Sequence, residues 1–180
     1  MWWVVMHVVG TVFGVGAATV NDLLFMRAIG NPEEGEAYRR YNASLSLLAW
    51  AGVLLIAISA VAFWLTHPQI HSSQKILTKI GLTIVVALNG LVMNVVLRPR
   101  LQALQPVDWT KRSKLTWAAG SGAVLGAISI VTWYTLLTLG AVGRVNWTAT
   151  QIVPIYLAAV VVAALLGSFM IHRRLKALTT

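Results

Sequence analysis

Apolar residues fill five stretches of the chain, each about 20 residues long, and shorter polar segments separate them. A helix needs about 20 apolar residues to cross the hydrocarbon core of a bilayer. The pattern therefore predicts five transmembrane helices, at residues 3–24, 44–65, 76–97, 115–139 and 152–171. Because the connections are short, we expect one transmembrane domain over residues 1–180, an all-α integral membrane protein that forms a five-helix bundle.

The composition agrees with a membrane protein. Of the 180 residues 58% are hydrophobic and 11% are charged, and the mean hydropathy is +0.76, whereas about 25% of the residues in a soluble domain are charged. The chain has no cysteine, which excludes disulfides, thiolate metal sites and covalent c-type haem attachment. Any metal would have to be bound by nitrogen and oxygen ligands.

The net charge of +9 is better explained by a membrane than by nucleic acid. Basic residues collect on the cytoplasmic loops of membrane proteins and meet anionic lipids there. The first and third connections and the carboxyl-terminal tail hold 11 of the 14 Lys and Arg residues, and the other two connections hold Lys75, Lys79 and Arg144. We therefore expect the amino end outside and the carboxyl end in the cytoplasm, with no nucleic-acid partner.

His7 is the candidate for chemistry in the first predicted helix. The residues that follow it at steps of three and four are Gly10, Gly14, Ala18 and Asn21. Small residues at this spacing form helix-packing faces in membranes, so His7 should point into the bundle. Two interpretations stay open: a histidine hydrogen-bonded across helices, or a ligand-binding or proton-handling group, since ionisable residues inside membranes are costly and often functional.

Polar and aromatic residues of the other predicted helices fall at a depth similar to that of His7. A ligand pocket lined by His7 and these residues is sterically plausible: Ser59, Lys79, Thr83, Trp133 and Tyr156. In the alternative interpretation, Trp133 and Tyr156 are only packing residues or members of the interfacial aromatic belt.

His67 and His71 stand four residues apart in the second connection, in the segment THPQIH. On a helix this spacing puts two imidazoles on one face, where they can bind a metal. No carboxylate is expected on that side, so His7, water or a backbone carbonyl would complete the site. The alternative is a solvated polar loop.

The remaining polar candidates are structural. Asp22, near the inner end of the first predicted helix, is expected to pair with Arg98 or Arg100, because an unpaired charge is costly there. Asn89 is expected to be a structural polar residue of the third helix. The segment EEGEAYRRY of the first connection is typical of a short amphipathic surface segment. The sequence has no nucleophile elbow, P-loop or HExxH motif.

HVVGTVFGVGAATVNDLLFMR and KIGLTIVVALNG resemble the first and third helices of small bacterial haem-associated membrane proteins, the HemJ-type protoporphyrinogen oxidases and the copper-resistance D-type proteins. In those families a His opens the first helix, and a Lys leads the third helix with a His about ten positions later. His7 and Lys79 match, but Asn89 stands at the later position. The resemblance implies haem b or a porphyrin, with His7 as an axial or hydrogen-bonding group and Lys79 meeting a carboxylate. GAISIVTWYTLLTLG resembles bacterial membrane proteins with no assigned chemistry.

Three functions are therefore expected for a protein of the cytoplasmic (inner) membrane of a prokaryote. The first is a haem- or porphyrin-binding protein or a redox accessory subunit. The second is a small-solute or lipid transporter or permease subunit, although five helices offer no even inverted repeat. The third is a structural protein that binds a membrane-protein partner or a second copy of itself.

Overall fold

The structure is a computed structural model, and it describes residues 2–29, 31–68, 72–102, 112–142 and 147–177. All regular elements in this part of the chain are helical. They are α1 (Trp2–Ala28), α2 (Pro32–Thr66), α3 (Gln74–Val92), the five-residue π-helix η2 (Met93–Leu97), α4 (Arg98–Gln102), α5 (Arg112–Ala141) and α6 (Ala149–Ala177). Helices α3, η2 and α4 follow one another without a break, so they form one spanning segment.

Five helical segments are long and apolar enough to cross a membrane. They are Trp2–Ala28, Glu34–Thr66, Gln74–Leu101, Trp117–Ala141 and Ala149–Lys176. Many of the exposed side chains are large and apolar, as contact with lipid tails requires; Leu54, Val95 and Leu165 are examples. The five predicted spans are confirmed as apolar helices, and the chain has the features of a multi-pass membrane protein.

Helix α2 begins much earlier than the hydrophobic pattern predicts. The pattern starts this helix at residue 44 and places a surface segment before it, whereas α2 starts at Pro32. Proline suits the first turn of a helix because its missing N–H would have no partner there. Glu36 and Arg39 form an exposed ion pair one turn further on. The polar segment is therefore the start of α2, and the first connection is correspondingly short.

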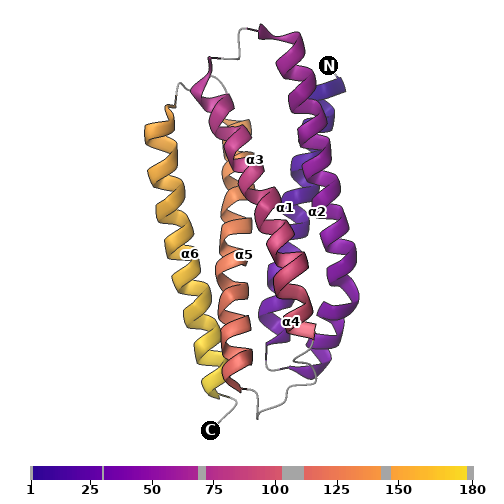
Figure 1. Cartoon of the computed structure of the whole chain (residues 1–180), viewed down its shortest axis with the longest axis vertical. Coiled ribbons are helices and arrows are strands. Elements are labelled where there is room, and N and C mark those ends of the chain that lie inside the picture. Colours follow the sequence, from indigo (N-terminus) through magenta and orange to yellow (C-terminus); the bar gives the residue numbers. More distant parts are fainter. Residues whose placement is uncertain (1, 30, 69–71, 103–111, 143–146, 178–180) are drawn as a thin grey trace.

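The helices stand side by side, with the amino terminus at one end of the bundle and the carboxyl terminus at the other (Figure 1). We call these the amino end and the carboxyl end of the bundle. Helix α1 packs along α2, α5 packs against α1 and α3, and α6 packs mainly on α5 at the edge. Helices α2 and α3 contact each other only sparsely, which leaves room for a cleft between them.

Small residues of α1 allow this packing. A Cβ atom on Gly10 would lie 2.8 Å from the carbonyl oxygen of Gly52 in α2, and a Cβ on Gly14 would overlap the indole ring of Trp133 in α5. Ala18, on the same face, is also buried. The prediction that this stripe faces the bundle interior is confirmed, and Trp133, only 2% exposed, is the large side chain that it receives.

Candidate functional site

His7 makes a hydrogen bond from α1 to α2. Its Nδ1 atom lies 2.9 Å from Oγ of the fully buried Ser59, and this hydroxyl donates to the carbonyl oxygen of Ile56, also at 2.9 Å. Because a hydroxyl has one hydrogen, Ser59 accepts from Nδ1–H of His7. In its neutral form the imidazole then has its lone pair on Nε2. The cross-helix hydrogen bond accounts for His7 structurally, and a ligand role stays a prediction.

Lys79 and Lys75 lie at the start of α3, against the end of α5. The Lys75 ammonium donates to the carbonyl oxygen of Val142 at 2.5 Å, and Lys79 Nζ lies 3.8 Å from where a Cβ on Gly140 would be. Lys79 is also within electrostatic reach of His7. The last carbonyls of a helix carry partial negative charge, which favours the Lys75 ammonium at this end of α5.

The other residues of the predicted pocket serve different contacts. The Thr83 hydroxyl donates to the carbonyl oxygen of Lys79 in its own helix, at 2.9 Å. The Tyr156 hydroxyl lies 2.9 Å from Oγ1 of Thr132, which links α6 to α5. Of the predicted pocket residues, His7 and Ser59 are joined by a hydrogen bond, and Trp133 is the one that lines the cleft described below.

The predicted histidine pair is described only in part. His67 is exposed, and its Nδ1 lies 2.7 Å from Oγ1 of Thr66. His71 lies outside the described residues, so a metal at this pair stays a prediction. Within the described ranges, no group of three or more His, Cys, Asp or Glu side chains is arranged to hold a metal ion.

The two positions that carry the haem resemblance make hydrogen bonds to different helices. His7 bonds to Ser59 of α2, whereas the buried Asn89 donates from Nδ2 to the carbonyl oxygen of Leu125 in α5, at 2.9 Å. The two positions therefore serve different helix pairs, and haem binding stays a prediction. The cleft that the structure describes does not include His7.

Asp22 does not form the expected ion pair. Its carboxylate is turned toward α5, with Oδ1 3.0 Å from where a Cβ on Gly126 would be. The Arg100 guanidinium instead lies over the ring of Trp117, 5.1 Å from its centroid. No ion pair joins Asp22 to Arg98 or Arg100 among the described residues, because Asp22 points between the helices and Arg100 points along the outside.

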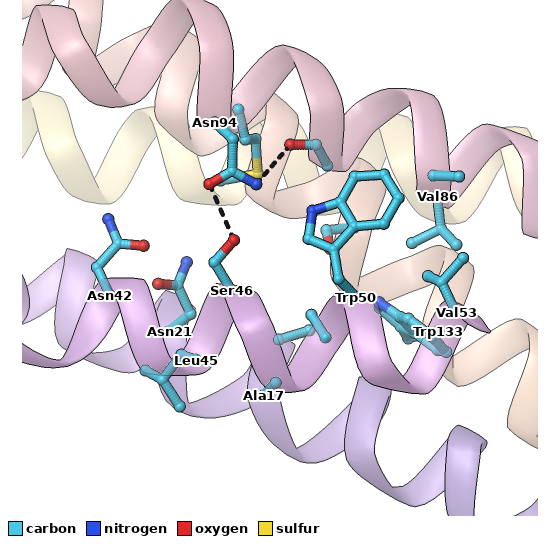
Figure 2. Close-up of a pocket in the computed structure, with 16 residues that line it drawn as sticks. Ala17, Asn21, Asn42, Leu45, Ser46, Trp50, Val53, Val86, Asn94 and Trp133 are labelled. Carbon is cyan, nitrogen blue, oxygen red and sulfur yellow. Dashed lines mark hydrogen bonds between the residues drawn. The ribbon is translucent and has the colours of Figure 1, made fainter. Parts of the chain in front are cut away.

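A polar cleft that the sequence interpretation missed lies in the half of the bundle nearer the carboxyl end. Its volume is about 70 Å³, and residues of α1, α2, α3, η2 and α5 line it. Figure 2 shows the polar side chains of Asn21, Asn42, Ser46 and Asn94 at one end and the rings of Trp50 and Trp133 at the other. Three different helical segments thus bring carboxamides to one place.

The π-helix presents Asn94 to the cleft. Pro99 lacks an N–H and so cannot donate an α-helical hydrogen bond. The N–H of the preceding residue, Arg98, bonds to the carbonyl oxygen of Met93, five residues earlier, which is the spacing of a π-helix. Asn94 donates from Nδ2 to the carbonyl oxygen of Gly90, at 3.0 Å, and accepts from the Ser46 hydroxyl, at 2.9 Å. Such π-turns are frequent at functional sites.

Two carboxamides of the cleft lack hydrogen-bond partners in the described chain. The Asn42 side chain makes no hydrogen bond to a described residue although Asn42 is only 9% exposed. The Oδ1 atom of Asn21 is buried without a partner. Unsatisfied polar groups at membrane depth cost several kcal/mol each. The Asn21 Oδ1 atom therefore needs a partner that the described residues do not supply, and the Asn42 carboxamide is open to one.

Fold and cleft together define a class: an all-helical multi-pass membrane protein with a hydrogen-bonding cleft inside its helix bundle. Comparisons with models of protein families, with curated proteins and with solved structures found no match. The resemblance to haem-associated membrane proteins therefore remains a prediction from the two quoted motifs.

Proposed function

We propose that the protein is a membrane-embedded binding protein for a small uncharged molecule, which it holds in the polar cleft as a carrier or a permease subunit. This is the second of the three functions expected from the sequence. The observation that carries the proposal is the pair of unpartnered carboxamides, Asn21 and Asn42, in a cavity whose opposite end is aromatic.

Water is the simplest alternative partner for these carboxamides. A cavity of about 70 Å³ has room for about five to seven water molecules at 10 to 15 Å³ each. Water would satisfy the polar end and the indole N–H groups, but it gains nothing from the apolar ring faces of Trp50 and Trp133, which form the other end. A ligand with a polar group and an apolar part matches both ends.

The experiment compares the small molecules that copurify with the wild-type protein and with its variants. Wild-type protein and Asn42→Leu are extracted into native nanodiscs with a lipid-solubilising polymer, and the bound compounds are identified by mass spectrometry. Thr83→Val is the matched control, because its hydroxyl bonds within its own helix and lies outside the cleft. We expect a compound that is retained by wild type and Thr83→Val and lost from Asn42→Leu. Identical profiles for all three proteins would refute a binding function for the cleft.

For the orientation, the proposal adopts an outside amino end and a cytoplasmic carboxyl end in the inner membrane of a prokaryote, supported by the asymmetry of Lys and Arg. The chain has no native cysteine, so introduced cysteines report alone. Ser72→Cys should react with an impermeant maleimide added outside whole cells, and Glu36→Cys only after lysis. The reverse labelling would show that the amino end lies in the cytoplasm.

Association with a second copy or another membrane protein is compatible with the exposed face of α6.

A further inference from the structure

The cleft is graded from polar to apolar along the bundle. Asn42 and Trp50 both lie on α2 and are eight residues apart, which is about 12 Å along a helix axis. Asn21 and Asn42 lie at the end of the cleft nearer the carboxyl end, and Trp50, Val53 and Val86 lie at the other (Figure 2). The polar end is thus nearer the membrane surface, and the apolar end is nearer the middle of the bilayer.

A lipid in the leaflet at the carboxyl end has this same orientation, with its head group at the surface and its chain toward the middle. Arg27, in the last turn of α1, marks the surface level close to Asn21. An amphiphile can therefore occupy the cleft in the orientation that it already has in the bilayer.

The mouth of the cleft faces sideways. Helices α2 and α3 contact each other only sparsely, and Trp50, which lines the cleft from α2, is 38% exposed. Ser46 and Asn94 are half-buried, and their hydrogen bond and the Trp50 ring, 3.7 Å from where a Cβ on Gly90 would be, bridge this gap, so entry requires these side chains to move. A ligand that passes between α2 and α3 reaches the carboxamides from the lipid rather than from the aqueous phase.

The hydrogen bonds that are still available select the head group. Ser46 donates to Asn94, and Asn94 uses one of its two N–H groups on Gly90. The unused groups are the donors and acceptors of Asn21 and Asn42, one N–H of Asn94, the lone pairs of Ser46, the Ser129 hydroxyl and the indole N–H groups of Trp50 and Trp133. No charged side chain is among the described residues that line the cleft, so nothing there neutralises a carboxylate or a phosphate.

A head group that both donates and accepts, and that carries no charge, satisfies this set. A hydroxyl does so, whereas a quinone or an ether only accepts. Building on the proposed function, we infer that the ligand is a lipid alcohol, which enters between α2 and α3 and binds through its hydroxyl group to Asn21 and Asn42, with the start of its chain against Trp50.

The test is photo-crosslinking in nanodiscs with a diazirine analogue of hexadecan-1-ol. The matched probes are its methyl ether, which cannot donate, and the corresponding carboxylic acid, which is charged. Labelled peptides are mapped by mass spectrometry. We expect the alcohol to label the cleft segments at residues 45–53 and 86–94 about fivefold more than the ether does, the factor that one hydrogen bond supplies. Asn42→Leu and Ser46→Ala should reduce this labelling, and Thr83→Val should not.

Each other result overturns the inference. Equal labelling by the three probes would show ordinary lipid contact, and stronger labelling by the acid would show a charged ligand. If the alcohol leaves the cleft unlabelled while an Asn42-dependent compound still copurifies with the protein, the lipid-alcohol inference fails and the proposed function stands. If neither is observed, both fail. Labelling that Asn42→Leu and Ser46→Ala leave unchanged would place the alcohol outside the polar end.

Discussion

Replacing Asn42 by leucine should stabilise the ligand-free protein. Asn42 is 9% exposed and has no hydrogen-bond partner among the described residues, so no other described side chain compensates the partial burial of its carboxamide. Mutational data put that cost at about 1 to 3 kcal/mol, and a leucine at this position adds favourable apolar contact inside the 70 Å³ cleft. We expect the free energy of unfolding to rise by about 1 to 2 kcal/mol.

The matched variant is Asn89→Leu, which removes the same carboxamide from a satisfied position. Asn89 donates to the carbonyl oxygen of Leu125 at 2.9 Å, so its loss should lower the free energy of unfolding by about 0.6 to 2 kcal/mol, the range for hydrogen bonds between membrane helices. Both values come from reversible unfolding in mixed detergent–SDS micelles, after bound compounds have been removed. If Asn42→Leu is destabilised as much as Asn89→Leu, Asn42 has a partner within the protein and the reasoning is wrong.

Three further predictions test the packing around the site. Gly14→Leu should lower the free energy of unfolding by about 3 kcal/mol, because the new side chain overpacks against the indole ring of Trp133. Gly16→Leu should be nearly neutral, because its added Cβ would meet nothing within 4 Å. Equal losses would mean that the stripe is not the packing face. A double-mutant cycle of His7→Ala and Ser59→Ala should give a coupling energy of about 0.6 to 2 kcal/mol, and additive effects would contradict their hydrogen bond. Asn94→Ala should cost about 1 kcal/mol because it removes the hydrogen bonds to the Gly90 carbonyl oxygen of α3 and from the Ser46 hydroxyl, and an unchanged unfolding midpoint would count against these contacts.

The five spans are predictable from the sequence because lipid imposes one requirement on all of them, a long run of apolar residues that bond their own backbone. The start of α2 is not predictable in that way. The first turns of α2 contain Pro32, Glu36 and Arg39 and lie outside the apolar run. Hydropathy therefore places the start of the helix at residue 44, although the helical backbone continues through that residue. The inward face of α1 can be predicted from the spacing of its small residues. Gly10 lets the backbone of α2 approach closely and Gly14 makes room for the indole ring of Trp133, whereas larger residues would clash with both.

The cleft depends on information that one sequence does not display. Asn21 is visible as the last polar residue of the stripe that begins at His7, and Asn42, Ser46 and Asn94 are visible as polar residues at the edges of apolar spans. Their convergence depends on which helices pack together and on the π-turn, which changes the direction of every later side chain. The predicted ion pair of Asp22 failed for the same reason, because pairing across helices requires the rotation of each helix about its axis.

The side-chain amide signals of the asparagines test most directly whether the cleft is a binding site. Protein labelled with ¹⁵N-asparagine is compared in native nanodiscs and after exchange into synthetic phosphatidylcholine nanodiscs, with the Asn42 signal assigned from its loss in Asn42→Leu. If a native compound occupies the cleft, the side-chain signals of Asn21 and Asn42 should shift between the two preparations, while that of Asn89, bonded to α5, should stay in place. Unchanged Asn21 and Asn42 signals, or an equal shift of Asn89, would contradict binding in the cleft.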